Sequence, residues 1–133
     1  MRISWIALIL ATVATAASAA EWEFVTISAK DSAYFIDRSS VRTASDVYGS
    51  YKMAWFKTDD SQNKSVKYRS SMLLYRAKCN AYELGLAQWI DYDANGVVLD
   101  SNTSNYVKYQ VVAPETVGYS ILSAICWPAD SIE

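Results

Sequence analysis

The stretch Val66–Tyr92, VKYRSSMLLYRAKCNAYELGLAQWIDY, decides the fold. Apolar side chains recur at every second position along residues 66–79 and again along residues 81–92, a spacing that predicts two long β-strands. One face of the first strand carries Leu73, Tyr75, Ala77 and Cys79. The matching face of the second carries Tyr82, Leu84, Leu86, Ile90 and Tyr92, with Gln88 as the one polar interruption. Two such apolar faces need a covering layer.

Shorter strand patterns flank this pair. The upstream ones are Trp22–Thr26, Ala33–Asp37 and Val47–Lys57, and Val97–Leu99 follows downstream. In Val47–Lys57, one side of the expected strand carries Val47, Tyr51, Met53 and Trp55, and the other carries Ser50 and Lys52. A turn is predicted at Arg38–Ser40, and a second at Asn95-Gly96, since both residues tolerate a positive φ angle.

The covering layer is predicted near the end of the chain. Pro114 and Thr116 are start signals for a helix, and Pro128 stops its continuation. Between them the apolar positions are Val117, Tyr119, Ile121, Leu122, Ile125 and Cys126, at helical spacing. A helix of about ten residues is expected, with Cys126 on or beside its buried face. The predicted fold is therefore α+β, an antiparallel sheet of five to six strands with one C-terminal helix packed on a face.

The first segment has the pattern of a cleavable secretory signal. Arg2 precedes an apolar run, and the small residues Ala17 and Ala19 suit a signal peptidase. We expect a signal peptide over residues 1–19 and a single domain over residues 20–133. The apolar run is shorter than the roughly 20 residues that a membrane span needs, and no cysteine for a lipid anchor lies in or next to it. These features predict an exported protein that is either periplasmic, or secreted or at the cell surface without a lipid anchor.

Composition excludes several function classes. The chain has 133 residues, a formal net charge of −2 and no histidine. Removing residues 1–19 leaves 11 basic and 14 acidic residues, a net charge of −3. Such a surface does not suit nucleic acid or anionic lipid. Without histidine, His-dependent catalytic triads and HExxH zinc sites are impossible.

Cys79 and Cys126 are the only cysteines in the sequence. In an oxidising compartment, two such thiols in a small domain are expected to be joined. A zinc site lacks further ligands, and a redox pair would have the CxxC spacing. We therefore predict a structural disulfide between Cys79 and Cys126 that fastens the helix to the sheet.

Two acidic segments are candidates for chemical sites. Asp59 and Asp60 lie in the polar connection Lys57–Lys64, where a hydrated turn is favoured over acid–base chemistry. The segment Asp91–Val98 imitates the start of a calcium loop, but the twelfth position is Asn102, so a plain Asn-Gly hairpin is favoured. The lysines have polar neighbours that keep them protonated. We expect no catalytic residue, no cofactor and no metal.

Aromatic side chains are abundant, with ten tyrosines and five tryptophans. Tyrosine and tryptophan suit recognition surfaces because they combine a large contact area with a polar group. The same residues also pack across strands within a sheet. The sequence leaves both interpretations open, and the ligand-binding residues unknown.

Several short motifs follow one another in a characteristic order along the chain. They are Trp22, Tyr34-Phe35-Ile36-Asp37 with Ser39-Ser40-Val41, the Trp55 strand, the strand ending at Cys79, the turn Tyr92–Val98, and Pro114 leading into a helix that ends at Cys126. In this order, they resemble the surface-adhesin protein E family of exported bacterial domains.

The resemblance implies an antiparallel sheet with a disulfide-tethered C-terminal helix, and a dimer that binds host extracellular-matrix proteins and plasminogen. Our leading hypothesis is a non-catalytic, exported binding module with a protein partner. The alternative is a periplasmic accessory or structural domain that binds an envelope protein.

Overall fold

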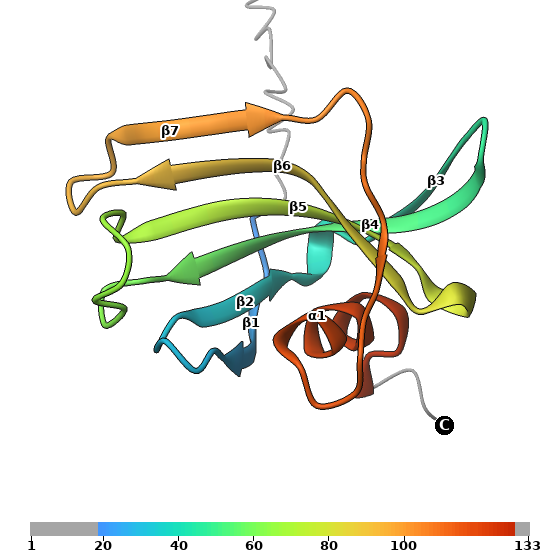
Figure 1. Cartoon of the computed structure of the whole chain (residues 1–133), viewed down its shortest axis with the longest axis horizontal. Coiled ribbons are helices and arrows are strands. Elements are labelled where there is room, and N and C mark those ends of the chain that lie inside the picture. Colours follow the sequence, from blue (N-terminus) through green and yellow to red (C-terminus); the bar gives the residue numbers. More distant parts are fainter. Residues whose placement is uncertain (1–18, 130–133) are drawn as a thin grey trace, which may run out of the picture.

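The computed structural model describes residues 19–129, which form an α+β domain as predicted. The predicted signal peptide falls, except for Ala19, outside the described residues. Eight antiparallel strands and one C-terminal α-helix make up the described part (Figure 1). The elements are β1 (Trp22–Ile27), β2 (Ala33–Asp37), η1 (Arg38–Ser40), β3 (Arg42–Asp46), β4 (Gly49–Asp59), β5 (Ser70–Lys78), η2 (Cys79–Ala81), β6 (Glu83–Tyr92), β7 (Val98–Thr103), β8 (Gln110–Val111) and α1 (Val117–Cys126).

The sheet is built around the two long strands that the sequence predicts. Its order is β1-β2-β4-β5-β6-β7, while β3 pairs with β4 and β8 with β6. The expected count of five to six strands is too low because β3 and β8 are not anticipated. β3 has the sequence RTASD, in which no apolar alternation marks a strand, and β8 is only two residues long.

The predicted strand Val47–Lys57 begins two residues too early. Val47 and Tyr48 form the tip of the β3–β4 hairpin, in which Asp46 pairs with Gly49. Val47 is 92% exposed, so its predicted place in the sheet is wrong. From Tyr51 onward the strand is confirmed, and Met53 and Trp55 share one side of it. This side faces away from α1, because Ala54 and Phe56 are the residues of β4 that belong to the core.

A β-bulge in β6 changes which residues face α1. Tyr75 pairs with Leu86 but Leu74 pairs with Gln88, so Ala87 is the extra residue. An extra residue in a strand reverses the facing of every side chain beyond it. The predicted common face of β6 is therefore correct at Leu84 and Leu86 but wrong at Ile90 and Tyr92, which lie on the opposite face. Trp89, paired with Leu73, takes their place.

α1 covers one end of one sheet face and closes the hydrophobic core. Thr116 caps the helix as predicted, since its hydroxyl accepts from the Tyr119 amide at 3.2 Å. The sheet contributes Ile36, Ala54, Phe56, Ala77 and Leu84 to the core, and the helix contributes Ile121, Leu122, Ala124, Ile125 and Cys126. Across residues 19–129, no helix is both long and apolar enough to cross a membrane.

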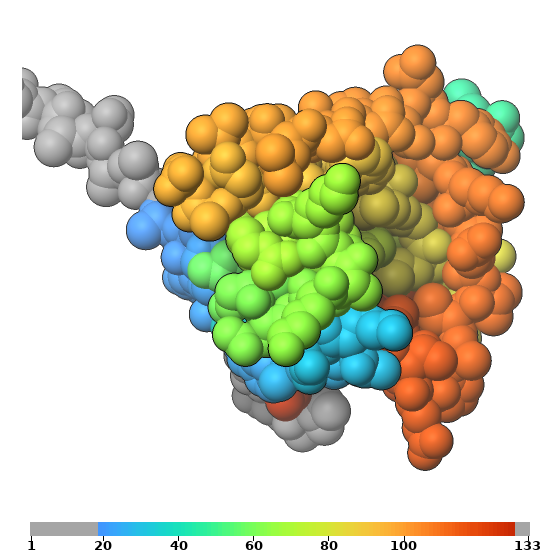
Figure 2. All heavy atoms as spheres, turned by 60° about the vertical axis from the view of Figure 1, so that its left-hand side comes forward, coloured from blue at the N-terminus to red at the C-terminus, as the bar shows by residue number. Residues whose placement is uncertain are grey.

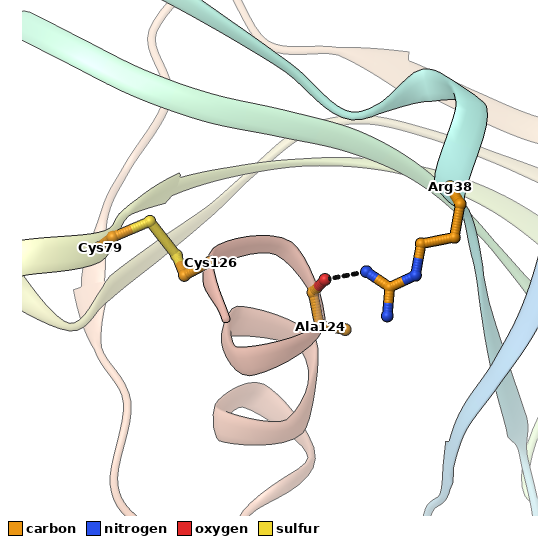
Figure 3. The surroundings of a disulfide bond; sticks show 4 residues. All are labelled: Arg38, Cys79, Ala124 and Cys126. Atoms are coloured by element: carbon orange, nitrogen blue, oxygen red, sulfur yellow. Dashed lines mark hydrogen bonds between the residues drawn. A yellow bond between two sulfur atoms is a disulfide. The ribbon is translucent and has the colours of Figure 1, made fainter. Parts of the chain in front are cut away.

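Two bonds hold the C-terminal end of α1 to the sheet (Figure 3). The predicted disulfide joins Cys126 to Cys79 at the end of β5, with the Cα atoms 5.7 Å apart. On the other side of the helix, Arg38 donates to the carbonyl oxygen of Ala124. A cation is favourable at a helix C-terminus, where carbonyl groups lack intrahelical partners. Arg38 also pairs with Glu23 at 2.8 Å, which links α1, η1 and β1.

Residues 104–116, called the strap below, connect β7 to α1 and include β8, which pairs antiparallel with the beginning of β6. Hydrogen bonds from Ser104 to Ala87 and from Val112 to Tyr82 fix the strap at both ends. Between them the strap passes so close to β6 that a Cβ atom at Gly85 would lie 2.5 Å from Cγ1 of Val107. Glycine at position 85 therefore sets how closely the strap approaches the sheet.

Candidate functional site

The α1 side of the sheet is only partly covered, and beside the helix it forms a cavity of about 480 Å³. In Figure 2 this face is hollowed between the green segment that precedes and begins β5 and the orange strap, with the olive β6 at the bottom. Four aromatic side chains line the cavity: Tyr34, Tyr68, Tyr75 and Trp89. Two carboxylates, Asp60 and Asp91, lie among them. We call this space the aromatic cavity.

A network of hydrogen bonds buries Asp60 in the cavity wall. Its two carboxylate oxygens accept from the hydroxyls of Ser32 and Thr58, each at 2.5 Å, and Asn63 donates to Ser32 at 2.9 Å. The Asp60 residue is only 2% exposed. The side-chain partners of this carboxylate are hydroxyl groups, and Asp60 acts electrostatically on the neighbouring Tyr34 and Tyr68.

The second carboxylate lies on the floor of the cavity, on β6. Asp91 accepts from the hydroxyl of Ser71 on β5 at 2.5 Å. The β-bulge at Ala87 is what turns Asp91, together with Trp89, toward the α1 side. Both side chains face the cavity because of this β-bulge, which the alternation of apolar and polar residues in the sequence does not reveal.

The tyrosines of the cavity respond to this environment. Burial raises the pKa of Tyr34, and the charge of Asp60 raises it further. Burial, then Asp60 and Asp91, raise the pKa of Tyr68. The pKa of Tyr75 is also raised, mainly by burial. All three hydroxyls are therefore neutral in the folded protein well above neutral pH, and the fields of both carboxylates reach Tyr68.

The prediction of a hydrated turn at Asp59 and Asp60 is correct for Asp59 and wrong for Asp60. Asp59 ends β4 in an exposed position, where its carboxylate accepts from the Ser61 amide at 2.9 Å. Asp60 points the other way, into the network described above. The burial of Asp60 depends on the short polar side chains of Ser32, Thr58 and Asn63. Nothing in the sequence indicates that these three residues meet at one place.

The favoured hairpin at Asn95-Gly96 is confirmed. Oδ1 of Asp93 accepts from the amides of Asn95 and Val97, at 2.8 and 2.9 Å. Aspartate commonly stabilises turns by such side-chain to backbone hydrogen bonds. Gly96 has a φ of 80°, the conformation for which glycine is suited. Asp91, the first residue of the calcium-loop pattern, is engaged elsewhere with Ser71.

One end of the opposite side of the sheet is covered by the strap, whose Val107 and Tyr109 lie against Gly85. Over the rest of this side, no element within residues 19–129 forms a covering layer. Strand pairing places apolar and aromatic side chains from β1, β2, β4, β5 and β6 on this side. We call the surface made by Trp22, Phe24, Phe35, Trp55, Lys57, Met72, Leu74 and Ile90 the open face. Phe24 is 55% exposed, and the other seven residues of the open face are half-buried.

Lys57 organises one end of the open face. Its ammonium lies 4.6 Å from the ring centre of Trp22 and 5.4 Å from that of Phe35. Phe24 meets Phe35 edge to face, with the ring centres 5.8 Å apart. These contacts hold large aromatic rings in fixed positions at the surface, an arrangement common at protein interfaces.

The packing interpretation of the aromatic residues is confirmed for some side chains, and the recognition interpretation stays a prediction for the exposed ones. Tyr75 packs edge to face on Phe56, with the ring centres 5.4 Å apart, and is part of the core region. Tyr48 and Tyr106 are more than 70% exposed. Cys79 and Cys126 hold the helix and take no part in either candidate surface.

A family model described as Surface-adhesin protein E matches residues 22–127. The matched span begins at the first residue of β1 and ends one residue after α1, so it includes the sheet, the strap and the disulfide. No curated protein and no solved structure matches the chain.

Proposed function

Because the chain belongs to the surface-adhesin protein E family, we propose that it is an exported module that binds a host extracellular-matrix protein or plasminogen through the open face. The family supplies the coarse function, an adhesin-like module of the exported or cell-surface class. The open face is the observation that carries the specific proposal.

The open face has the composition of a protein-binding surface. It combines two tryptophans, two phenylalanines and one methionine, residue types that are enriched where proteins meet, with the single ammonium group of Lys57. Its strands are braced from behind by the core and by α1, so the rings need little reordering when a partner binds. Binding that orders few side chains loses less entropy and is therefore tighter.

The first experiment is a titration on immobilised laminin, vitronectin and plasminogen, using the exported domain with its disulfide intact. The proposal predicts saturable binding to at least one of the three. The absence of saturable binding to all three would refute the host-partner assignment and favour the alternative, an accessory domain that binds an envelope protein.

The second experiment assigns the surface with a matched pair of variants. Phe24→Glu places a charge on the open face, and we expect it to weaken binding by roughly 10-fold or more, because a desolvated charge opposes an apolar contact. Val111→Glu on β8 places the same charge at a 73% exposed position outside the open face and should leave binding unchanged. Equal losses in both variants would contradict the assignment.

A third experiment concerns location. We propose that the module reaches the cell surface, where a host protein can contact it. Protease treatment of intact cells should therefore remove it from the outer-surface fraction. Complete protection of the module in intact cells, together with release by disruption of the outer membrane, would place it in the periplasm instead.

A further inference from the structure

We propose that the aromatic cavity is a binding site for a monovalent organic cation, the alkylammonium or guanidinium group of the kind carried by lysine and arginine side chains. This site lies on the α1 side of the sheet, away from the open face. It therefore does not depend on the proposed function, and each can fail without the other.

The walls of the cavity suit a cation that carries apolar groups. Tyr34, Tyr68 and Tyr75 approach from β2, from the segment before β5 and from β5, and Trp89 lies on β6. The faces of aromatic rings attract ammonium and guanidinium groups, tryptophan most strongly, and their apolar surface accepts the attached hydrocarbon chain. Leu73 and Leu86 extend this apolar lining.

The charge of the cavity is negative and unbalanced. Asp60 is nearly fully buried and has only hydroxyl groups as side-chain partners, and Asp91 has one such partner. Within residues 19–129, the ion pairs join Arg38 to Glu23 and Arg76 to Asp46, and neither involves the cavity. A bound cation would supply the opposite charge that these carboxylates lack.

The size of the cavity fits a side chain rather than a bare ion. About 480 Å³ lies within the usual range for small-molecule sites and greatly exceeds the space of one ammonium group. Lys30 is the one basic residue among those that line the cavity, and it is exposed. The ammonium group of Lys30 can therefore stay hydrated at the rim, and the interior of the cavity can accept a cation from another molecule.

The test uses capped amino acids as probes. N-acetyl-arginine amide and N-acetyl-lysine amide carry the cation on a peptide-like unit, butylguanidine carries the same single charge on a small free molecule, and N-acetyl-citrulline amide is the neutral match for arginine. Binding is followed by calorimetry and by NMR shifts of the Trp89 indole and of the Leu73 and Leu86 methyl groups. We expect at least one cationic probe to bind saturably with shifts at these groups, and citrulline to bind at least ~10-fold more weakly.

Binding of butylguanidine alone would identify small free cations as the source, and binding of capped arginine or lysine would identify protein side chains. Either result supports the proposal. Citrulline binding as tightly as arginine, shifts confined to other parts of the domain, or no saturable binding of any cation up to ~10 mM would overturn it.

Variants identify the groups responsible. Asp91→Asn keeps an acceptor for Ser71 and removes only the charge, so we expect the affinity for the cationic probe to fall about 10-fold with an unchanged thermal midpoint. Trp89→Leu should also weaken binding and gives a second test if either variant is unstable. Glu21→Gln, a loss of one charge at an exposed position outside the cavity lining, should leave binding unchanged. Equal effects of Asp91→Asn and Glu21→Gln would contradict the site.

Discussion

Removing the disulfide tests how α1 is held, and its effect can be worked out from the structure. Cys79 and Cys126 are 47 positions apart, and the loop-closure model gives a stabilisation of about 4 kcal/mol for a loop of that length. For a domain of roughly 110 residues, this corresponds to a thermal midpoint lower by about 15–20 °C. The variant to use is Cys79→Ser with Cys126→Ala, because Cys126 is buried and a hydroxyl there would lack a partner.

The free energy of unfolding is measured by urea titration of the oxidised wild type, the reduced wild type and the double variant. The reduced wild type and the double variant should agree, and the double variant should not respond to reductant. A loss below about 1 kcal/mol would refute the reasoning, since it would mean that packing and Arg38 alone hold α1.

Three further predictions address other features. Arg38→Gln removes the charged donor to the Ala124 carbonyl and should lower the free energy of unfolding by about 1–2 kcal/mol in a urea titration; no change would show that the contact contributes nothing. Gly85→Ala should lower it by about 1–3 kcal/mol and increase hydrogen exchange in the strap, because the new methyl group meets Val107; unaltered exchange would contradict the close approach. Folding raises the pKa of Tyr75, so the contribution of the neutral Tyr75 hydroxyl to stability is complete below pH ~10 and is lost as the pH rises further. The variant Tyr75→Phe should therefore unfold at a higher pH than the wild type when unfolding is followed by tyrosinate absorbance. An unchanged midpoint of alkaline unfolding would refute this.

The parts of the fold that follow from local pattern are predictable from the sequence. Alternation identifies the long strands β5 and β6, and capping by Thr116 with helical spacing identifies α1. The number of cysteines and the expected compartment identify the disulfide between Cys79 and Cys126. Each of these signals is contained in a short stretch or in the composition.

The parts that depend on contacts between distant segments are not predictable in the same way. The bulge at Ala87 arises from the pairing of β5 with β6, and it alone decides that Trp89 and Asp91 face α1. Asp60 is buried because Ser32 comes to it from 28 residues away, whereas its immediate neighbours in the sequence predict a hydrated turn. The aromatic cavity therefore cannot be predicted from short stretches of sequence. For the open face, the composition indicates an excess of aromatic residues.

Side-chain footprinting of the domain on its partner tests the central claim most directly. The domain is oxidised by hydroxyl radicals, free and when bound to whichever of laminin, vitronectin or plasminogen it binds, and the modified residues are identified by mass spectrometry. The account predicts that Phe24, Trp55 and Met72 on the open face become protected while the exposed Tyr48 and Tyr106 do not change. Protection of Tyr48 and Tyr106 with unchanged modification of the open face would contradict it.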